Sequence, residues 1–339
     1  MTLHNKFLNL KDSKSKIFIS NFNKKINIIF LCFNLNGKRK DEYIMCLYAI
    51  LSFFKKHNQI DPKMYDIYVY TDDAEKFEYV KDRVKIRLLS HSKLKKWARI
   101  GKEPFMLFIK MMVILEVTKK TKNNILFLDS DVIIKKEFSN LVNKLSKRDS
   151  FMFEKEYKLK DKKNIAGFVR HVNKKLQEGN KDAKKVELII GKSINSFLSG
   201  TFPMWNSGLL AIHKSNINIL EPALDLTKAL LSLRKNIPKY YKTHAIEQLA
   251  YTFVLLSNSK LHPAKKYINH YWRSKKLYIK RIKIFLNIIK KKNITIEDLI
   301  HTKKYNYLFF SVIWKHMLLR KYKKIRLFTG MCKRPFIKI

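Results

Sequence analysis

The sequence contains little cysteine, glycine or proline: three Cys, eight Gly and seven Pro in 339 residues. The cysteines Cys32, Cys46 and Cys332 are too few and too scattered for a disulfide framework or a metal-ligand spacing, which favours a reducing compartment. Scarce Gly and Pro argue against low-complexity linkers. No window approaches the roughly 20 apolar residues needed to cross a bilayer, and residues 1–16 lack the apolar core of a secretory signal. We therefore expect a cytoplasmic chain whose 46% hydrophobic residues form a core.

Acidic residues are also scarce, because 27 Asp and Glu oppose 72 Lys and Arg and leave a net charge of +45. Such a field attracts polyanions, whether nucleic acid, phosphorylated sugars or an anionic membrane leaflet. Codon bias is an alternative source of part of the excess, since Lys, Ile and Asn are abundant together. From Lys275 to the end, however, 19 Lys or Arg face only Glu297 and Asp298. This segment is therefore the more informative basic patch.

The hydrophobic pattern predicts strands that alternate with helices. Strands are expected at 26–33, 65–71, 84–89 and 207–213, and helices at 41–57, 104–118, 221–233 and 245–256. Two basic amphipathic helices are expected at 277–289 and 305–328. The Lys-rich segment 151–199 is expected to form a loop and helix insertion rather than core, placed to cover a ligand. This alternation predicts an α/β fold with a mainly parallel sheet flanked by helices.

Two carboxylates, Asp129 and Asp131, interrupt the apolar run NNILFLDSDVII at 123–134. Ionised Asp is rarely buried unless it is paired or binds a metal. At the C-terminal end of a strand, where an α/β sheet opens into its ligand crevice, both acids can bind one divalent cation. The alternative is a strand that ends in a polar turn, with Asp used for local hydrogen bonds.

Four motifs, LFLDSDV, WNSGLLAI, HAIEQLAY and NHYWRSKK, follow one another along this alternating chain. In this order they resemble GT-A glycosyltransferases, most closely those of family 8, over residues 26–276. The resemblance implies a Rossmann-like nucleotide-sugar-binding domain at 25–276, with 151–199 as an acceptor-side insertion. A basic lead-in at 1–24 and a basic helical extension at 277–339 flank it.

The resemblance assigns a metal site to Asp129, Asp131 and His270, with Lys276 near the diphosphate. Two carboxylates and one imidazole suit Mn²⁺, which accepts nitrogen as well as oxygen; Mg²⁺ is the alternative. The metal would neutralise the diphosphate leaving group, and Lys276 would add a point charge. Arg273 stands where the family has a glycine, which puts the close approach of the backbone to the phosphate in question.

The same resemblance places Asn206, Ser207 and Gly208 beside the donor sugar, and Glu247 and Gln248 as the catalytic pair. The Glu247 carboxylate would bind a sugar hydroxyl and the Gln248 side-chain oxygen would lie near the anomeric carbon, although the family usually has Asp at the first position. The remaining donor-binding residues implied are Asn34, Tyr43, Lys110 and Ser130. For Lys110 a solvent-facing position is the alternative, and for Tyr43 a place in the helix core.

The implied reaction is a metal-dependent transfer of a hexose from a nucleotide-diphosphate donor, expected to be a UDP-sugar, to a hydroxyl of a surface glycan or lipid-linked saccharide. Similarity to family 8 implies retention, whereas an inverting enzyme would need a general base, for which Glu247 is the first candidate. The segment 277–339 predicts peripheral contact with an anionic inner membrane face.

Two other classes stay open at this point. A nucleic-acid-binding protein is suggested by charge alone, without zinc-finger spacing, an RNP-like segment or a helix-turn-helix, so no specific nucleic acid is expected. A sugar nucleotidyltransferase would carry a Gly-rich phosphate loop after the first strand, where this chain has NLNGKRKDE with only Gly37.

Overall fold

The computed structural model describes residues 25–35, 37, 39–100, 103–234, 245–309 and 311–312. Two compact units are present, one ending at His270 and the other beginning at Tyr271. This division lies close to the predicted boundary at residue 276. Lys276 therefore belongs to the second unit, whereas Asp129, Asp131 and His270 belong to the first.

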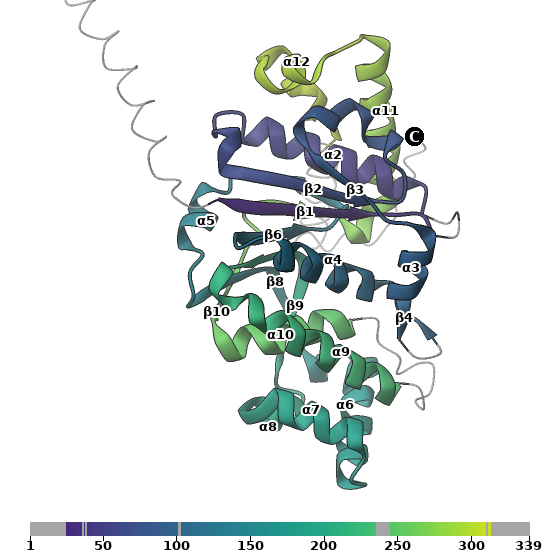
Figure 1. The fold of residues 1–339 in the computed structure, drawn as a ribbon, viewed down its shortest axis with the longest axis vertical. Coiled ribbons are helices and arrows are strands. Elements are labelled where there is room, and N and C mark those ends of the chain that lie inside the picture. The colour runs from purple at the N-terminus through teal and green to yellow at the C-terminus, as the bar shows by residue number, and fades with distance from the viewer. Residues whose placement is uncertain are drawn as a thin grey trace, which may run out of the picture. The chain divides into compact units, whose positions relative to one another are not determined.

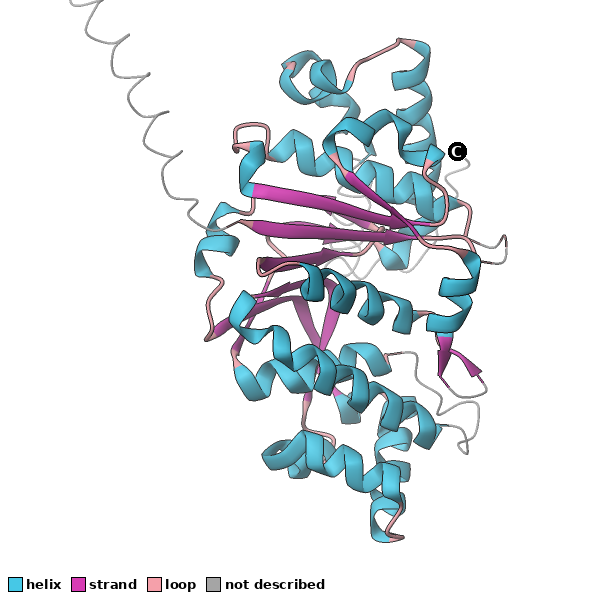
Figure 2. Cartoon of the chain, in the orientation of Figure 1, coloured by secondary structure: helices cyan, strands magenta, loops and turns pink. Residues whose placement is uncertain are grey.

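A seven-stranded sheet in the order β10-β8-β9-β6-β1-β2-β3 forms the centre of the first unit (Figure 2). Its strands are β1 Ile26–Cys32, β2 Tyr65–Thr71, β3 Lys85–Leu88, β6 Asn124–Leu128, β8 Asp149–Lys158, β9 Pro203–Ile212 and β10 Lys260–Pro263. Neighbouring strands are parallel, except that β9 is antiparallel to both β6 and β8. The predicted α/β fold with a mainly parallel sheet is confirmed.

Two short antiparallel ribbons are the other strand pairs among the described residues of this unit. One pairs β7, Val132–Ile134, with β11, Ile268–His270, and the other pairs β4, Arg99–Ile100, with β5, Glu103–Pro104. None of these strands is long enough to show a period of two in the sequence. The sequence therefore could not predict them.

Helices cover both faces of the sheet (Figure 1). The α-helices of the first unit are α2 Asp41–Lys56, α3 His91–Ala98, α4 Leu107–Lys120, α5 Ser139–Lys144, α6 Lys163–Gln177, α7 Lys181–Ile190, α8 Ile194–Leu198, α9 Leu220–Arg234 and α10 Ile246–Asn258. Its 3₁₀ helices are η2 Pro62–Met64, η3 Glu75–Arg83, η4 Leu159–Asp161, η5 Gly191–Ser193 and η6 Lys214–Ile219. Alternate residues of β1 serve the two faces, as the pleat of a strand requires. Ile28 lines a small apolar cavity with Phe53 of α2, whereas Ile29 joins the core formed with α4, α9 and α10.

Segment 151–199 differs from its prediction, because its first part is a strand of the central sheet. β8 is ten residues long and lies between β10 and β9, with Phe151, Met152 and Phe153 buried. Its second half, EKEYK, is polar and hid the strand from the hydrophobic pattern. Helices α6 to α8 then form the predicted excursion, although Phe168 and Val186 on them join the core.

The second unit contains α11, Lys275–Lys291, and α12, Ile296–His301, with the 3₁₀ helices η8 Trp272–Ser274 and η9 Lys303–Tyr305. One face of α11 is buried through Tyr278, Ile282, Phe285 and Ile289, which confirms the amphipathic helix predicted at 277–289. The helix predicted at 305–328 lies mostly outside the described residues. Among the helices that the structure describes, none has the length and apolar character to span a bilayer.

Candidate metal and nucleotide-sugar site

The acidic pair lies where β6 leaves the sheet. β6 is buried throughout because it runs between β1 and β9, and Asp129 is the first residue after it, with its N–H donated to the Gly208 carbonyl at 3.0 Å. The chain then forms β7, which pairs with β11 so that Val132 lies opposite His270. This ribbon brings His270 beside Asp131, 139 positions away in the sequence.

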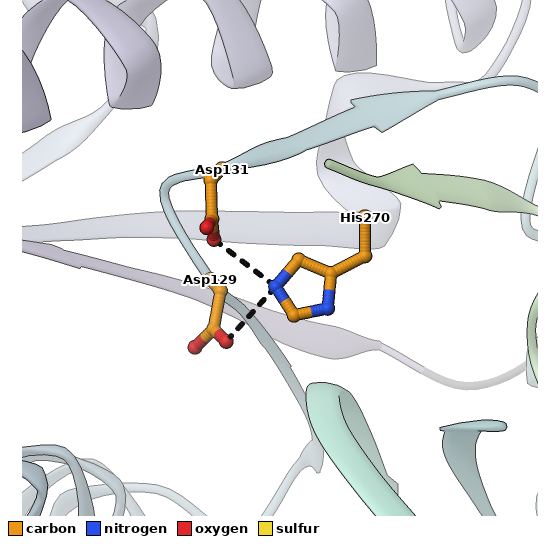
Figure 3. A group of neighbouring side chains, drawn as sticks. All are labelled: Asp129, Asp131 and His270. Atoms are coloured by element: carbon orange, nitrogen blue, oxygen red, sulfur yellow. Dashed lines mark hydrogen bonds and ion pairs between the residues drawn. The ribbon is translucent and has the colours of Figure 1, made fainter. Parts of the chain in front are cut away.

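The side chains of Asp129, Asp131 and His270 converge on one point, as predicted (Figure 3). His270 Nε2 lies 3.1 Å from Asp131 Oδ1 and 3.6 Å from Asp129 Oδ2. One ligand atom from each residue falls within 4.8 Å of the other two. Burial lowers the pKa of His270, but the Asp131 and Asp129 carboxylates outweigh burial and raise this pKa above its usual value.

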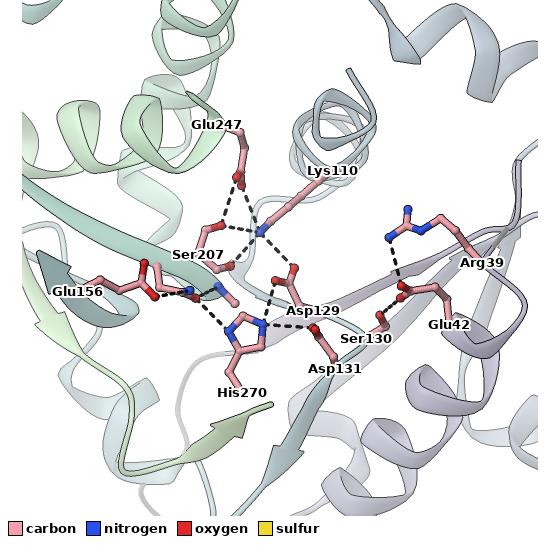
Figure 4. Close-up of polar contacts among 12 residues, drawn as sticks. Arg39, Glu42, Lys110, Asp129, Ser130, Asp131, Glu156, Ser207, Glu247 and His270 are labelled. Carbon is pink, nitrogen blue, oxygen red and sulfur yellow. Dashed lines mark hydrogen bonds and ion pairs between the residues drawn. The ribbon is translucent and has the colours of Figure 1, made fainter. Parts of the chain in front are cut away.

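Lys110 joins the acidic pair to the predicted catalytic helix α10 (Figure 4). Its Nζ lies 3.2 Å from Asp129 Oδ1 and 3.1 Å from Glu247 Oε1, and it donates to the Ser207 carbonyl at 2.8 Å and to Ser207 Oγ at 2.9 Å. Burial lowers the pKa of Lys110, but Asp129 and Glu247 outweigh burial and raise it. The solvent-facing alternative for Lys110 is therefore wrong, since the residue is only 4% exposed.

The charge of this cluster fits a divalent cation. Asp129, Asp131 and Glu247 contribute three negative charges and Lys110 one positive charge, which leaves −2 when His270 is neutral. Lys110 contacts Oδ1 of Asp129, while Oδ2 of the same carboxylate faces His270. Two hard oxygen ligands with one imidazole nitrogen form a donor set that Mn²⁺ accepts. The residues present therefore fit the predicted metal.

The NSG sequence of β9 lies beside this cluster. Asn206 Oδ1 accepts a hydrogen bond from the Gly208 N–H at 2.8 Å and lies 3.0 Å from His270 Nδ1. Asn206 Nδ2 donates to Glu156 Oε1 on β8 at 3.2 Å. Ser207 Oγ donates to Glu247 Oε2 at 3.3 Å. All three residues of this motif thus contact the acidic cluster or the histidine.

Gly208 is required by the position of the His270 ring. A Cβ added to Gly208 would lie 2.3 Å from His270 Nδ1, 2.5 Å from Cε1 and 2.8 Å from Cγ. Gly208 is not among the glycines with positive φ. The residue is therefore needed for space and not for backbone conformation.

A second group of predicted residues lies at the ends of β1 and β2. Tyr43 OH donates to Asp72 Oδ1 at 2.6 Å, and the Asn34 N–H donates to Asp72 Oδ2 at 3.0 Å. Burial and the Asp72 carboxylate raise the pKa of Tyr43. Asn34 Oδ1 in turn accepts the Arg39 N–H at 2.7 Å. Asn34 and Tyr43 are thus held in one network at the carboxyl ends of parallel strands.

The other predicted residues are more dispersed. Ser130 is buried and donates its hydroxyl to Glu42 of α2. Gln248 is half-buried on α10, next to Glu247. Lys276 on α11 and Arg273 on η8 belong to the second unit, so their roles toward the diphosphate stay predictions.

Sequence reasoning missed Glu156 and Glu42, two acids that contact predicted site residues. Glu42 occupies the first turn of α2, where an acidic residue is equally explained by the helix dipole. Glu156 lies in the polar half of β8. Recognising β8 as a strand would have placed it beside the NSG sequence of β9, but the register opposes Glu154 to Asn206, and no local pattern signals the shift at Glu156.

No protein-family model matches the chain, and no curated protein matches it in sequence. Among solved structures, the chain is similar to the glycosyltransferase GlyE of Streptococcus pneumoniae TIGR4, with 12% identity and a TM-score of 0.40, covering 89% of this chain and 64% of that one. It thus spans less than two thirds of the pneumococcal protein.

The chain is also similar to the galactosyltransferase LgtC in complex with donor and acceptor sugar analogs, with 13% identity and a TM-score of 0.40 over 76% of this chain and 94% of that one. A third similar structure is mouse xyloside xylosyltransferase 1, with 11% identity and a TM-score of 0.39 over 70% of this chain and 84% of that one. All three are glycosyltransferases, the class that the four sequence motifs resemble. At this level of similarity, the case for an activity rests on the site.

Proposed function

We propose that this protein is a metal-dependent glycosyltransferase of the GT-A type, which transfers a hexose from a nucleotide-diphosphate donor, a UDP-sugar, to a hydroxyl of a surface glycan or lipid-linked saccharide. The observation that carries the proposal is the convergence of Asp129, Asp131 and His270 at the carboxyl edge of a mainly parallel sheet. Ligands of α/β sheets bind at this edge. The nucleotide would lie toward Asn34 and Tyr43, beyond the ends of β1 and β2.

The metal would be held by Asp129 Oδ2, Asp131 Oδ1 and His270 Nε2, the atoms that face one another. A bound divalent cation supplies the charge that stabilises a departing diphosphate. Lys110 fixes Asp129 by its other oxygen, which keeps Oδ2 directed at the site. The chain therefore provides an oriented set of ligands before the donor binds.

Glu247 is better placed to position other groups than to remove a proton. It is 0% exposed, and its two oxygens contact Lys110 and Ser207. A general base must reach the proton that it removes, which a carboxylate held in this way cannot easily do. This supports the retaining alternative, with Gln248 near the sugar.

The test is a screen of UDP- and GDP-sugars with Mn²⁺, in which release of the nucleotide diphosphate is followed. We expect turnover with a UDP-sugar, and a loss of at least about 100-fold in Asp131→Asn. Asp225→Asn, which removes a half-buried acid of α9 that pairs with Lys228, is the matched control and should keep wild-type turnover. Neither turnover nor binding with any donor would reject the transferase proposal. Release of pyrophosphate instead would indicate a nucleotidyltransferase.

We further propose that the basic segment 277–339 contacts an anionic membrane surface. On α11, the exposed residues include Lys280, Lys283 and Lys290, while Tyr278, Ile282, Phe285 and Ile289 form the buried face of the helix. Each Lys near an anionic leaflet contributes about 1 kcal/mol. Reversing these three charges to Glu should therefore weaken binding to anionic vesicles by roughly 100-fold or more at low salt.

The matched control reverses three exposed lysines of α7 instead. Lys181, Lys184 and Lys185 provide the same change in net charge on the first unit. Equal losses in the two triple variants would show that net charge, and not the α11 surface, governs vesicle binding.

A further inference from the structure

Asn206 lies between the metal-binding histidine and an acid that the motifs did not indicate. It is 3% exposed. Its Oδ1 accepts the Gly208 N–H at 2.8 Å and lies 3.0 Å from His270 Nδ1, while its Nδ2 donates to Glu156 Oε1 at 3.2 Å. Both functional groups of the amide are therefore engaged.

These partners determine which way the amide faces. A backbone N–H can only donate and an ionised carboxylate can only accept, so the oxygen must point to Gly208 and the nitrogen to Glu156. The atom that faces His270 Nδ1 is consequently an acceptor. Nδ1 must carry the proton, and the lone pair of the neutral ring is then on Nε2, toward Asp131 and Asp129.

The strands are shaped so that Glu156 can reach Asn206. β8 and β9 pair Lys155 with Trp205 and Tyr157 with Met204, so that Glu156 is an extra residue in β8. Such a bulge changes the direction of a side chain and is frequent beside functional sites. The contact between Glu156 and Asn206 thus depends on an irregularity of the sheet and not on its regular register.

We propose that Asn206 and Glu156 are positioning residues of the metal site: Glu156 fixes the amide of Asn206, and Asn206 fixes the ring and tautomer of His270, so that Nε2 presents its lone pair to the cation. This inference rests on the proposed function. It gives Asn206 a role distinct from contact with sugar hydroxyls. Outer partners of a ligating histidine commonly change metal affinity by 10–100-fold when they are removed.

The experiment measures the affinity of the full chain for Mn²⁺ by electron paramagnetic resonance of the free ion, without donor. Asn206→Ala should weaken Mn²⁺ binding by 10–100-fold and Glu156→Ala by about tenfold. Glu156→Gln should stay within about twofold, because its amide oxygen can still accept the Asn206 N–H. Glu154→Ala on the same strand is the matched control and should also stay within twofold, since Glu154 lies opposite Asn206 in the register but its carboxylate pairs with Lys265.

Thermal unfolding of each variant separates loss of the site from loss of the fold. If the variant at buried Asn206, Asn206→Ala, does not fold, the Ala and Gln variants of half-buried Glu156 test the inference instead. The inference is overturned if Glu156→Ala and any folded Asn206 variant bind Mn²⁺ within twofold of wild type while His270→Ala binds at least tenfold more weakly. The proposed metal site would stand in that case. Unchanged binding in His270→Ala would instead reject the metal site and this inference with it.

Discussion

Replacing Gly208 by alanine is expected to displace His270 and thereby disable the proposed metal site. The new Cβ would lie 2.3 Å from His270 Nδ1, whereas Cβ atoms essentially never approach closer than 3.0 Å, so the ring must withdraw by at least about 0.7 Å. The backbone of Gly208 has no positive φ and accepts alanine without strain. The entire effect should therefore come from the His270 ring.

The magnitude follows from the crowding. Overpacking a tight site reduces the free energy of unfolding by about 1–3 kcal/mol, and a displacement of nearly 1 Å in a catalytic group reduces turnover by up to about 100-fold. His270→Ala removes the three ring atoms that the new Cβ would meet. In that background Gly208→Ala should be neutral, or should stabilise by about 0.4–1 kcal/mol by lowering the conformational entropy of the unfolded chain.

The assay is urea unfolding of the wild type, both single variants and the double variant, combined with Mn²⁺ titration. The predicted coupling energy between the two positions is about 1–3 kcal/mol, and Gly208→Ala should weaken Mn²⁺ binding as strongly as His270→Ala does. Additive effects on stability, with Mn²⁺ binding unchanged in Gly208→Ala, would refute the argument that His270 packs on Gly208.

Three further predictions concern buried groups. Burial lowers the pKa of His57 to about 4 from an ordinary 6.5. The free energy of unfolding, measured by urea titration, should therefore fall by about 3 kcal/mol as the pH is lowered from 6.5 to about 4. A free energy of unfolding that does not change over these pH values would contradict this. Lys110→Met should lower the free energy of unfolding by about 3–5 kcal/mol by leaving buried Glu247 unpaired, and Lys110→Met/Glu247→Leu should recover most of the loss; no recovery would argue against the pair. Tyr43→Ala should bind UDP about tenfold more weakly in calorimetry through lost stacking, whereas Tyr43→Phe should stay within threefold; equal losses would assign the effect to the hydroxyl.

The prediction for His57 follows from its position at the end of α2. Its Nδ1 donates to the Phe53 carbonyl at 2.9 Å, and its Nε2 accepts the Phe138 N–H at 2.9 Å. Protonation would remove the acceptor that holds Phe138. As the pH falls, the His57 ring of the unfolded chain is therefore protonated first, while the ring in the folded protein stays neutral.

Three of the predicted strands are marked by buried apolar runs, whereas β3 was predicted although most of its residues are exposed. β1, β2 and β6 contain the apolar runs 28–32, 67–70 and 125–128, because strands inside a sheet that is covered on both faces bury both of their sides. The acidic pair interrupts such a run, which located the C-terminal end of β6. Asp129 and Asp131 could be placed at the ligand edge for the same reason.

The remaining parts of the site depend on pairings that no local pattern encodes. The pairing of β7 with β11 joins segments of three residues each, and only this ribbon brings His270 to Asp131. The resemblance supplied His270, and the residues alone did not. Lys110 lies on an apolar helix, and its burial became evident only when acids from two other elements met it.

The central claim, that Asp129, Asp131 and His270 bind one divalent cation with the nucleotide diphosphate, is tested most directly by anomalous diffraction from crystals grown with Mn²⁺ and UDP. We predict a single manganese peak bounded by Asp129 Oδ2, Asp131 Oδ1 and His270 Nε2, with the diphosphate of UDP on its open side. UDP bound in the same crystals without manganese at these three atoms, or manganese bound elsewhere, would contradict the proposed site.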